Sequence, residues 1–358
     1  MKKKYMIIGG FLVFLSIVAF EKVYEGEIAE WFKQPVVLND ERQSVEEVSS
    51  IVDDSFIEKE KVSFAEHERF IGLTADEVTD EFGEPKRIDL SAYGYDWWIY
   101  PTSNNSYMQI GIEDDQVVTV FLTGDIRGKS LSFGQTYNEI NELLHFQKNV
   151  DVKTSDGGVY QFELTDEDVN TRPIAELGGH WVQFYFDSYT KELSSMRIIV
   201  NDVLIRQRPY SVSYRGSLPE RPVFSKDEWS RIESGNARQI FDFTNVIRSR
   251  HGLDPFEWEG KVAEVAYLHS MDMSNNQYFS HTSPTYGELS DRFSNGDVPF
   301  MLAGENIAAK YIDGVASVEG WLNSEGHRVN ILHKEFTHLG VGVYQEYYTQ
   351  NFMTPWQL

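Results

Sequence analysis

The pattern of apolar and polar positions predicts two folded regions after residue 70. Between 70 and 205, two helical segments, FIGLTADEVTDEFGEP and FGQTYNEINELL, are each followed by three alternating, aromatic-rich strand segments. Thr74, with Glu77 three positions later, has the pattern of a capping box that starts a helix. Because a helix followed by three strands occurs twice, the sequence predicts an α+β domain with a weak internal repeat over 70–205.

Helical spacing dominates the start of the second region, 230–358. Apolar residues suited to one helix face recur in four segments: 237–251, 258–275, 288–295 and 314–323. The last segments, HLGVGVYQE and YYTQNFM, alternate in the manner of a β-hairpin. The prolines and weak periodicity of 206–229 predict a linker between the two domains.

The first 25 residues have the pattern of an export signal. Lysines at 2–4 precede an uncharged, mostly apolar run from Tyr5 to Phe20. At ~1.5 Å per residue the run spans about 24 Å, slightly less than a ~30 Å hydrocarbon core. No small-x-small cleavage site follows it, which favours an uncleaved signal anchor over a cleaved signal peptide. With the lysines inside, the rest of the chain is expected outside the cell.

Residues 26–69 are expected to form an acidic spacer between the membrane and the folded body. Within them, 39–60 contain eight acidic and two basic residues and almost no aromatic ones. Such a composition favours a solvated, extended chain. An amphipathic helix docked on the body is the alternative, given the apolar residues spaced between 45 and 52.

Composition narrows the classes of function. Lys and Arg number 32 against 56 Asp and Glu, and the net charge is −24, so the surface repels phosphate backbones and nucleic acid is not an expected partner. Cysteine is absent, which excludes disulfides, thiolate metal sites and cysteine nucleophiles. The C-terminal region 230–358 holds 9 basic and 16 acidic residues, so most of the negative charge precedes it.

Three short segments carry the candidate chemistry of the C-terminal region: YFSHTSP (278–284), AGENIA (303–308) and SEGHRVNIL (324–332). They supply His281, Glu305 and His327 in settings rich in Gly, Ser and Asn, which we expect to lie away from helix interiors. Two imidazoles and a carboxylate could hold a divalent cation such as zinc, or could polarise a water molecule. The alternative is that all three are structural groups that cap loops.

These segments, in the order FSH, GEN, GHR-x-NIL, GVGV and YTQNF, resemble the CAP superfamily, also called SCP-like, in its bacterial extracellular branch. The superfamily includes the cysteine-rich secretory proteins. The resemblance covers 237–354, and 70–205 is similar to the CAP-associated N-terminal domain. It implies an α-β-α sandwich with an open cleft, lined in the family by two histidines and two acidic residues. Some members bind zinc there through the histidines.

Carried over by position, the resemblance puts His281 on the first histidine of the family and Glu305 on the first glutamate. His327 is our choice for the second histidine, so the resemblance implies His281 and His327 as the metal ligands. Many members carry that histidine directly before Tyr-Thr-Gln, where this chain has Tyr347.

The position of the second glutamate holds Ser324, so acid–base pairing between two carboxyl groups is not available. Asn306 is included in the expected ligand cleft, although we expect it mainly to hold the Glu305 segment. His269 lies among apolar residues of a predicted helix, so we expect a packed core histidine.

The sequence favours a binding or scaffold module of the cell envelope, extracellular and either anchored or secreted. Its His/Glu cleft would hold a divalent metal or a small ligand without turnover, and its partner would be an envelope ligand, a lipid or a protein. The alternative is a zinc-dependent extracellular hydrolase that acts on peptides or the cell wall, with Glu305 activating the water. A third hypothesis makes the protein purely structural.

Overall fold

The computed structural model describes residues 70–103, 105–124, 133–154 and 157–356. The predictions for the signal anchor (1–25) and the acidic spacer (26–69) lie outside these residues. None of the helices in the described ranges has the length and apolar character needed to cross a bilayer.

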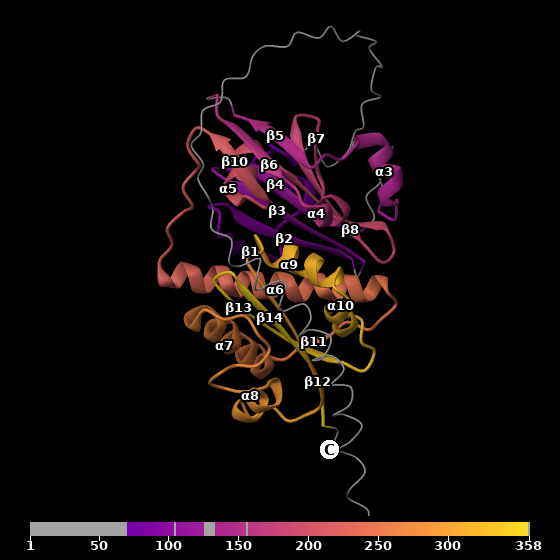
Figure 1. Ribbon diagram of the computed structural model, residues 1–358, viewed down its shortest axis with the longest axis vertical. Helices are drawn as coiled ribbons and strands as arrows, with labels where there is room; N and C mark the ends of the chain where they lie inside the picture. Colours follow the sequence, from indigo (N-terminus) through magenta and orange to yellow (C-terminus); the bar gives the residue numbers. More distant parts are fainter. Residues whose placement is uncertain (1–69, 104, 125–132, 155–156, 357–358) are drawn as a thin grey trace, which may run out of the picture. The chain divides into compact units, whose positions relative to one another are not determined.

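The N-terminal domain is built on a seven-stranded sheet in which all neighbouring strands are antiparallel (Figure 1). Its order is β1-β2-β3-β4-β9-β8-β7. The strands are β1 (Arg87–Leu90), β2 (Asp96–Ser103), β3 (Ser106–Glu113), β4 (Gln116–Thr123), β7 (Ile174–Leu177), β8 (His180–Asp187) and β9 (Glu192–Ile199).

A smaller sheet of order β10-β6-β5 and four short helices complete this domain. The strands are β5 (Asn149–Lys153), β6 (Val159–Glu163) and β10 (Ser211–Arg215). The helices are α2 (Ala75–Phe82), α3 (Tyr137–Leu144), α4 (Asp166–Thr171) and α5 (Asn201–Gln207).

The two helix starts of the predicted internal repeat are confirmed, but the second unit is not a helix followed by three strands, because β5, β6 and α4 lie between α3 and strands β7 to β9. Thr74 caps α2 with Glu77, and Thr136 caps α3 with Glu139, each in a complete capping box. Each threonine also forms an isolated bridge to the first residue of a later strand, Thr74 to β4 and Thr136 to β9. Since β4 and β9 are neighbours in the large sheet, the two repeats meet at its centre.

The C-terminal domain contains a four-stranded sheet of order β11-β13-β14-β12. The strands are β11 (Glu257–Trp258), β12 (Phe300–Ala309), β13 (His338–Tyr344) and β14 (Tyr347–Pro355). The helices are α6 (Lys226–Arg250), α7 (Gly260–Asn276), α8 (Leu289–Asn295), α9 (Gly314–Leu322) and α10 (Glu325–Ile331). The predicted hairpin is confirmed as β13 and β14.

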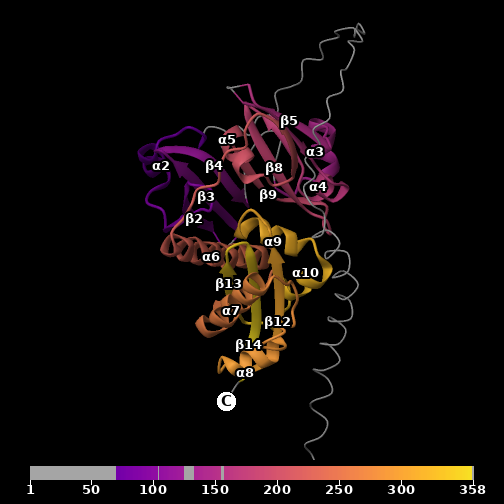
Figure 2. The same cartoon turned by 60° about the vertical axis from the view of Figure 1, so that its left-hand side comes forward.

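Helices cover both faces of this sheet (Figures 1 and 2). Successive residues of β14 point to opposite sides: Phe352 belongs to the core that includes α6 and α9, and Met353 packs with residues of α7 and α8. On the α7 side the neighbouring strand β13 lies very close to the helix: a Cβ on Gly342 of β13 would lie 1.8 Å from the backbone nitrogen of Tyr267. The α-β-α sandwich is thereby confirmed.

Several elements differ from the sequence prediction. Helix α6 begins at Lys226 rather than near 237, because Ser225 and Glu228 form a capping box within the expected linker. The same range, 206–229, also contains strand β10, which pairs with β6. Glu305 lies inside strand β12 and His327 inside helix α10. Neither element was predicted, because the segments around both residues are rich in Gly, Ser and Asn.

Helix α6 packs against both domains. On it, Phe243 stacks on Tyr107 of β3, with ring centroids 6.2 Å apart, and meets Phe121 of β4 edge-on at 5.3 Å. Beside these rings, Gln239 Nε2 donates to Asp89 Oδ2 of β1 at 3.0 Å. The helix therefore packs on the N-terminal sheet and on β13 of its own domain.

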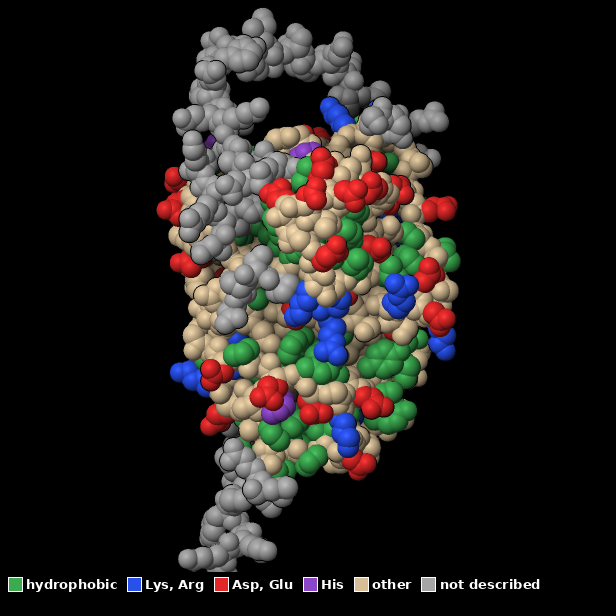
Figure 3. All heavy atoms as spheres, turned by 180° about the vertical axis from the view of Figure 1, so that it is seen from behind, with side chains coloured by type: hydrophobic (Ala, Val, Ile, Leu, Met, Phe, Trp, Pro, Cys, Tyr) green, Lys and Arg blue, Asp and Glu red, His purple; other side chains and the backbone are tan. Residues whose placement is uncertain are grey.

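Charge is distributed unevenly on the face seen in Figure 3. Asp and Glu side chains are frequent over the upper part, which is the N-terminal domain, and Lys and Arg side chains gather near the middle. This agrees with the sequence, in which the last 129 residues carry a smaller share of the negative charge.

Candidate functional site

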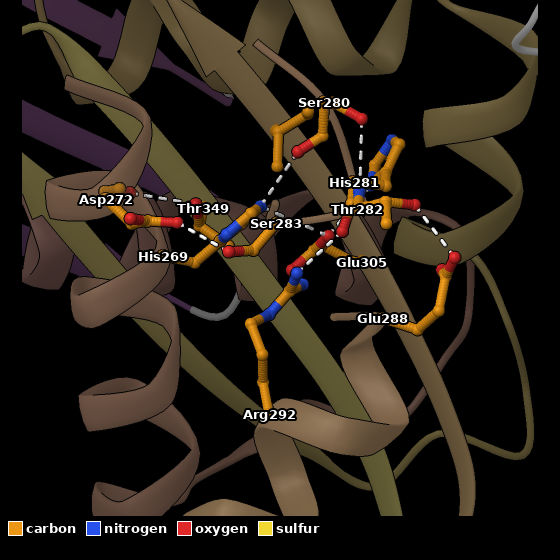
Figure 4. A network of polar contacts seen from close by, with 12 residues as sticks. His269, Asp272, Ser280, His281, Thr282, Ser283, Glu288, Arg292, Glu305 and Thr349 are labelled. Atoms are coloured by element: carbon orange, nitrogen blue, oxygen red, sulfur yellow. Dashed lines mark hydrogen bonds and ion pairs between the residues drawn. The ribbon is translucent and has the colours of Figure 1, made fainter. Parts of the chain in front are cut away.

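Glu305 is the central acid of the candidate site. Strand β12 places it opposite Asn351 of β14, and its side chain is 4% exposed. Its two oxygens have separate partners: His281 Nδ1 lies 2.8 Å from Oε1, and Arg292 Nη2 donates to Oε2. Figure 4 shows the three side chains converging. The structure thus brings together two of the predicted residues, His281 and Glu305, and adds an arginine.

Arg292 also fixes the loop that carries His281. It lies on α8 and is buried. Its Nη1 donates to the carbonyl oxygen of His281 at 2.6 Å and to that of Gly287 at 3.3 Å. One guanidinium therefore neutralises Glu305 and holds the backbone on both sides of the loop, as the forked geometry of Arg allows.

A second imidazole, that of His269, approaches Glu305 from α7 (Figure 4). Its Nε2 lies 3.1 Å from the carbonyl oxygen of Ser280 and 3.8 Å from Glu305 Oε1. Since a carbonyl only accepts, Nε2 carries the proton. Burial lowers the pKa of His269 to about 4, although Glu305 opposes this shift, so the ring is neutral at pH 7. His269 is buried as expected, but it also belongs to the site.

The environment of Glu305 keeps its carboxylate ionised. Burial by itself raises the pKa of Glu305. The nearby charge of Arg292, the proximity of His269 and the hydrogen bond from His281 have the opposite and larger effect, so the net pKa is lowered to about 2. A carboxylate with so low a pKa is a weak base near neutral pH. Glu305 is therefore suited to orienting a neighbouring group rather than to accepting a proton.

His281 is the more exposed member of the pair, with 21% of its side chain exposed. Because Nδ1 donates to the ionised Glu305, the neutral ring carries its proton on Nδ1, and Nε2 is the acceptor nitrogen. The arrangement of a carboxylate behind an imidazole is one that proteins use to fix the orientation of a histidine.

Helix α10 and its N-cap hold two more of the predicted residues, His327 and Ser324. Ser324 is its N-cap residue, and its Oγ lies 2.8 Å from His327 Nδ1. The carbonyl oxygen of His327 accepts a hydrogen bond of 3.1 Å from Asn306, the neighbour of Glu305 in β12. The position where the family carries an acid thus holds a hydroxyl that pairs with the candidate second histidine.

A buried amide network fixes α10 against β12. Asn330 Nδ2 donates to Glu305 O at 3.1 Å and to Asn306 Oδ1 at 2.9 Å. Asn306 Nδ2 in turn donates to Gln350 Oε1 of β14 at 3.1 Å. Asn306 is 0% exposed, so its side chain positions the elements around Glu305 instead of facing solvent.

Metal binding depends on the donor atoms that the site offers. Among the residues that the structure describes, no group of three or more His, Asp or Glu side chains could hold a metal ion. Both oxygens of Glu305 already pair with Arg292 and His281, so the predicted set offers two imidazoles, one ligand fewer than a catalytic zinc takes from protein. The donor set does not fit a catalytic zinc centre.

Two hollows of the described surface lie at other places. One, of about 530 Å³, is lined by the last turn of α10 and the residues that follow it, from Arg328 to Glu335. The other, of about 240 Å³, lies where α6, α7 and β13 meet and includes Glu233, Trp258 and Tyr267. Neither hollow is lined by His281, Glu305 or His327.

Sequence reasoning missed two members of the site, Arg292 and His269. A signal for the arginine exists: Arg292 follows Leu289 by three positions and precedes Phe293, so it lies on the apolar face of a short helix. A buried arginine requires an acid partner, but nothing in the spacing identifies Glu305 as that partner. The pairing of His269 with Glu305 likewise depends on packing between α7 and β12.

Comparisons with known proteins agree with this architecture. The model of the CAP-associated N-terminal domain matches residues 71–210, and that of the cysteine-rich secretory protein family, or CAP, matches 241–354. The chain belongs to the cysteine-rich secretory protein family, in the form that joins a CAP-associated N-terminal domain to a CAP domain.

Relatives align with most of the chain. The chain is 48% identical over 288 residues to the uncharacterized membrane protein YlbC of Bacillus subtilis (strain 168), covering 80% of this chain and 83% of YlbC. An extracellular protein containing an SCP domain from Bacillus anthracis str. Ames is 41% identical, with a TM-score of 0.76 over 87% of this chain and 99% of that one. A cysteine-rich secretory protein from Staphylococcus aureus subsp. aureus Mu50 shares the fold, at 24% identity and a TM-score of 0.70 over 80% and 91% of the two chains.

Proposed function

We propose that the protein is an extracellular, envelope-associated binding or scaffold module whose C-terminal site holds a small ligand without turnover. The observation that supports this most is the state of Glu305, buried and ionised between Arg292 and His281. A carboxylate stabilised in this way gives little general-base catalysis. With Ser324 at the place of the second acid, the site has no acid–base pair of carboxyl groups.

The extracellular location is supported by relatives. The similar Bacillus anthracis protein is described as extracellular, and YlbC as a membrane protein. Anchoring through the N-terminal segment stays a prediction. Protease treatment of intact cells tests the location, since an exposed chain is digested without lysis, and the N-terminal residue of the mature protein shows whether the segment is cleaved.

A divalent metal shared by His281 and His327 is the second form of this proposal. The Nδ1 atoms of these rings face Glu305 and Ser324, so a zinc ion would take Nε2 of each ring, with Glu305 behind His281 as an orienting carboxylate. Zinc bound by two imidazoles would supply a fixed positive charge for an anionic ligand. Zinc content of the purified full chain is expected to fall in the double variant His281→Ala, His327→Ala.

The alternative function is an extracellular hydrolase, and one observation favours it. The hydrogen bond between His281 Nδ1 and Glu305 at 2.8 Å resembles the carboxylate–histidine pair that orients a general base. In this form His281 would take a proton from a water molecule, and Glu305 would stabilise the imidazolium. The Glu305-activated water expected from the sequence is disfavoured by the low pKa of that carboxyl.

The decisive experiment measures turnover and binding on the same proteins. Full chain, His281→Ala and Glu305→Gln are assayed for casein and peptidoglycan hydrolysis, and for a thermal shift with added zinc. The control is His338→Ala, which removes a histidine near Glu257, at 3.5 Å, in β13. Equal inertness of all variants, with a zinc shift that is lost in His281→Ala and kept in His338→Ala, supports binding. Hydrolysis that requires His281 overturns the binding proposal.

A further inference from the structure

We propose that Glu319 is a proton-linked latch that holds the N-terminal domain on the helix pair α9–α10, which carries Ser324 and His327. The proposal is independent of the ligand and of the chemistry of the His281–Glu305 pair. It rests on a buried carboxyl group at the contact between β9 and α9, on its partners, and on the connections from that contact to α10.

The carboxyl group of Glu319 is enclosed by the two domains. Glu319 lies on α9 and is 2% exposed. Its Oε1 accepts hydrogen bonds from two hydroxyl groups of β9, Ser194 Oγ at 3.0 Å and Ser195 Oγ. Among the described residues, Oε2 has no hydrogen-bond partner. An ionised carboxylate here would bury charge on an oxygen that nothing compensates, whereas the neutral acid is tolerated.

The charged groups around Glu319 do not remove this cost. Arg250 of α6 attracts the carboxylate, but its Nη1 donates to Ser194 O at 3.0 Å. Asp187 of β8 repels it, and is itself paired with Arg328 of α10 at 2.8 Å. Burial is the largest influence and raises the pKa of Glu319 to about 7, against the lowering effect of Ser195 and Ser194. Ionisation therefore falls near neutral pH.

The same contact leads directly to α10. The turn between β8 and β9 holds the α9–α10 junction, since Ser188 N donates to Asn323 Oδ1 at 2.7 Å and Asn323 Nδ2 donates to Phe186 O at 2.9 Å. Asn323 directly precedes Ser324. A change in how α9 packs on β9 is thus transmitted to Ser324 and His327 of the candidate site.

The direction of the pH effect follows from the raised pKa. The unfolded or separated state has the ordinary value of 4.5, and the closed state a value near 7. The closed state is favoured in full below pH 4.5, and this contribution is lost as the pH rises through about 7. Acid pH therefore stabilises the contact between α9 and β9, and alkaline pH weakens it.

Hydrogen exchange of the full chain tests the latch. Amide protection of α9 and β9, corrected for intrinsic exchange, is expected to fall about tenfold between pH 6 and pH 8 in the wild type, because one carboxyl group ionises over this range. Glu319→Gln keeps an oxygen for the serine hydroxyls but cannot ionise, so its protection is expected to stay constant. Glu325→Gln, an exposed residue of α10, is the matched control and keeps the wild-type response.

A second variant covers the case in which Glu319→Gln fails to fold. Ser195→Ala removes a hydrogen bond that lowers the pKa of Glu319, so its protection is expected to keep falling to a higher pH than that of the wild type. The latch is overturned when wild-type protection does not change between pH 6 and 8. It is equally overturned when Glu319→Gln shows the wild-type fall in protection, or when the fall in Ser195→Ala ends at the same pH as in the wild type.

Discussion

Arg197 and Asp313 form a buried ion pair between the two domains, with Nη2 of the arginine 2.7 Å from Oδ2 of the acid. Their side chains are 1% and 6% exposed. Arg197 lies on β9 between the rings of Trp97 and Phe121, and Asp313 caps α9 by accepting from Ala316 N at 3.0 Å. One carboxylate thus stabilises a helix start and a buried guanidinium at the same time.

We expect removal of this charge to destabilise the whole folded unit. Asp313→Asn retains a good N-cap residue but leaves Arg197 buried without a counter-charge, which should cost about 3–5 kcal/mol of unfolding free energy. Asp313→Ala also removes the cap, at about 1 kcal/mol more. Urea unfolding measures both. A cost below that of the cap alone for Asp313→Asn would show that the pair contributes little.

Acid sensitivity should depend on Glu305. Its folded pKa, near 2, lies below the ordinary 4.5, so its stabilising contribution is complete above pH 4.5 and is lost as the pH falls towards 2. Glu305→Gln should be less stable at pH 7 and should lose less stability between pH 5 and pH 3. Unfolding free energies at these pH values test this, with Glu325→Gln as the exposed control. Parallel pH profiles for the wild type and Glu305→Gln would contradict it.

His269 should remain neutral well below the pH at which an ordinary histidine is protonated. Its pKa, lowered to about 4 by burial, means that stability is complete above pH 6.5 and falls as the pH drops towards 4. Nitrogen-15 NMR of the ring, assigned with His269→Asn, should show a proton on Nε2 and no protonation of Nδ1 at pH 5.5. A charged ring at that pH would refute the arrangement described for α7 and Glu305.

The close approach of β13 to α7 should not tolerate a methyl group. A Cβ at Gly342 would meet Tyr267 N at 1.8 Å, and both groups are backbone, so Gly342→Ala should cost about 3 kcal/mol or more. Gly260→Ala is the matched control, because nothing lies within 4 Å of a Cβ there. It should be neutral or slightly stabilising, as Ala is a better helix residue than Gly. Thermal unfolding of both variants compares them directly.

Local signals in the sequence predicted much of the fold. The capping boxes at Thr74 and Thr136 depend on residues three apart, so the chain itself contains the whole motif. The final hairpin is similarly local. Strand β12 was not predicted, because the segment around Glu305 contains Gly, Glu and Asn, which strands usually avoid, and pairing with β14 outweighs that preference.

The candidate site was predicted only in part, because local motifs identify some of its residues and long-range packing brings in the others. His281 and Glu305 were identified by their Gly-, Ser- and Asn-rich segments and then by the resemblance, and the structure places them in contact. The guanidinium of Arg292 was not identified, because it meets Glu305 only after α8 has packed on β12. The contact of the two domains through α6 and α9 was also invisible, since partners such as Glu319 and Ser194 are 125 positions apart.

The position of helix α6 limits where the chain can be shortened without exposing buried residues. The segment that matches the secretory-protein family begins at 241, inside a helix that extends from Lys226 to Arg250. A shortened protein that started there would lack the Ser225 cap and would present Phe243 to water, without the rings of Tyr107 and Phe121. The C-terminal third therefore shares part of its core with the N-terminal sheet, and a partner that displaced that sheet would expose an aromatic surface.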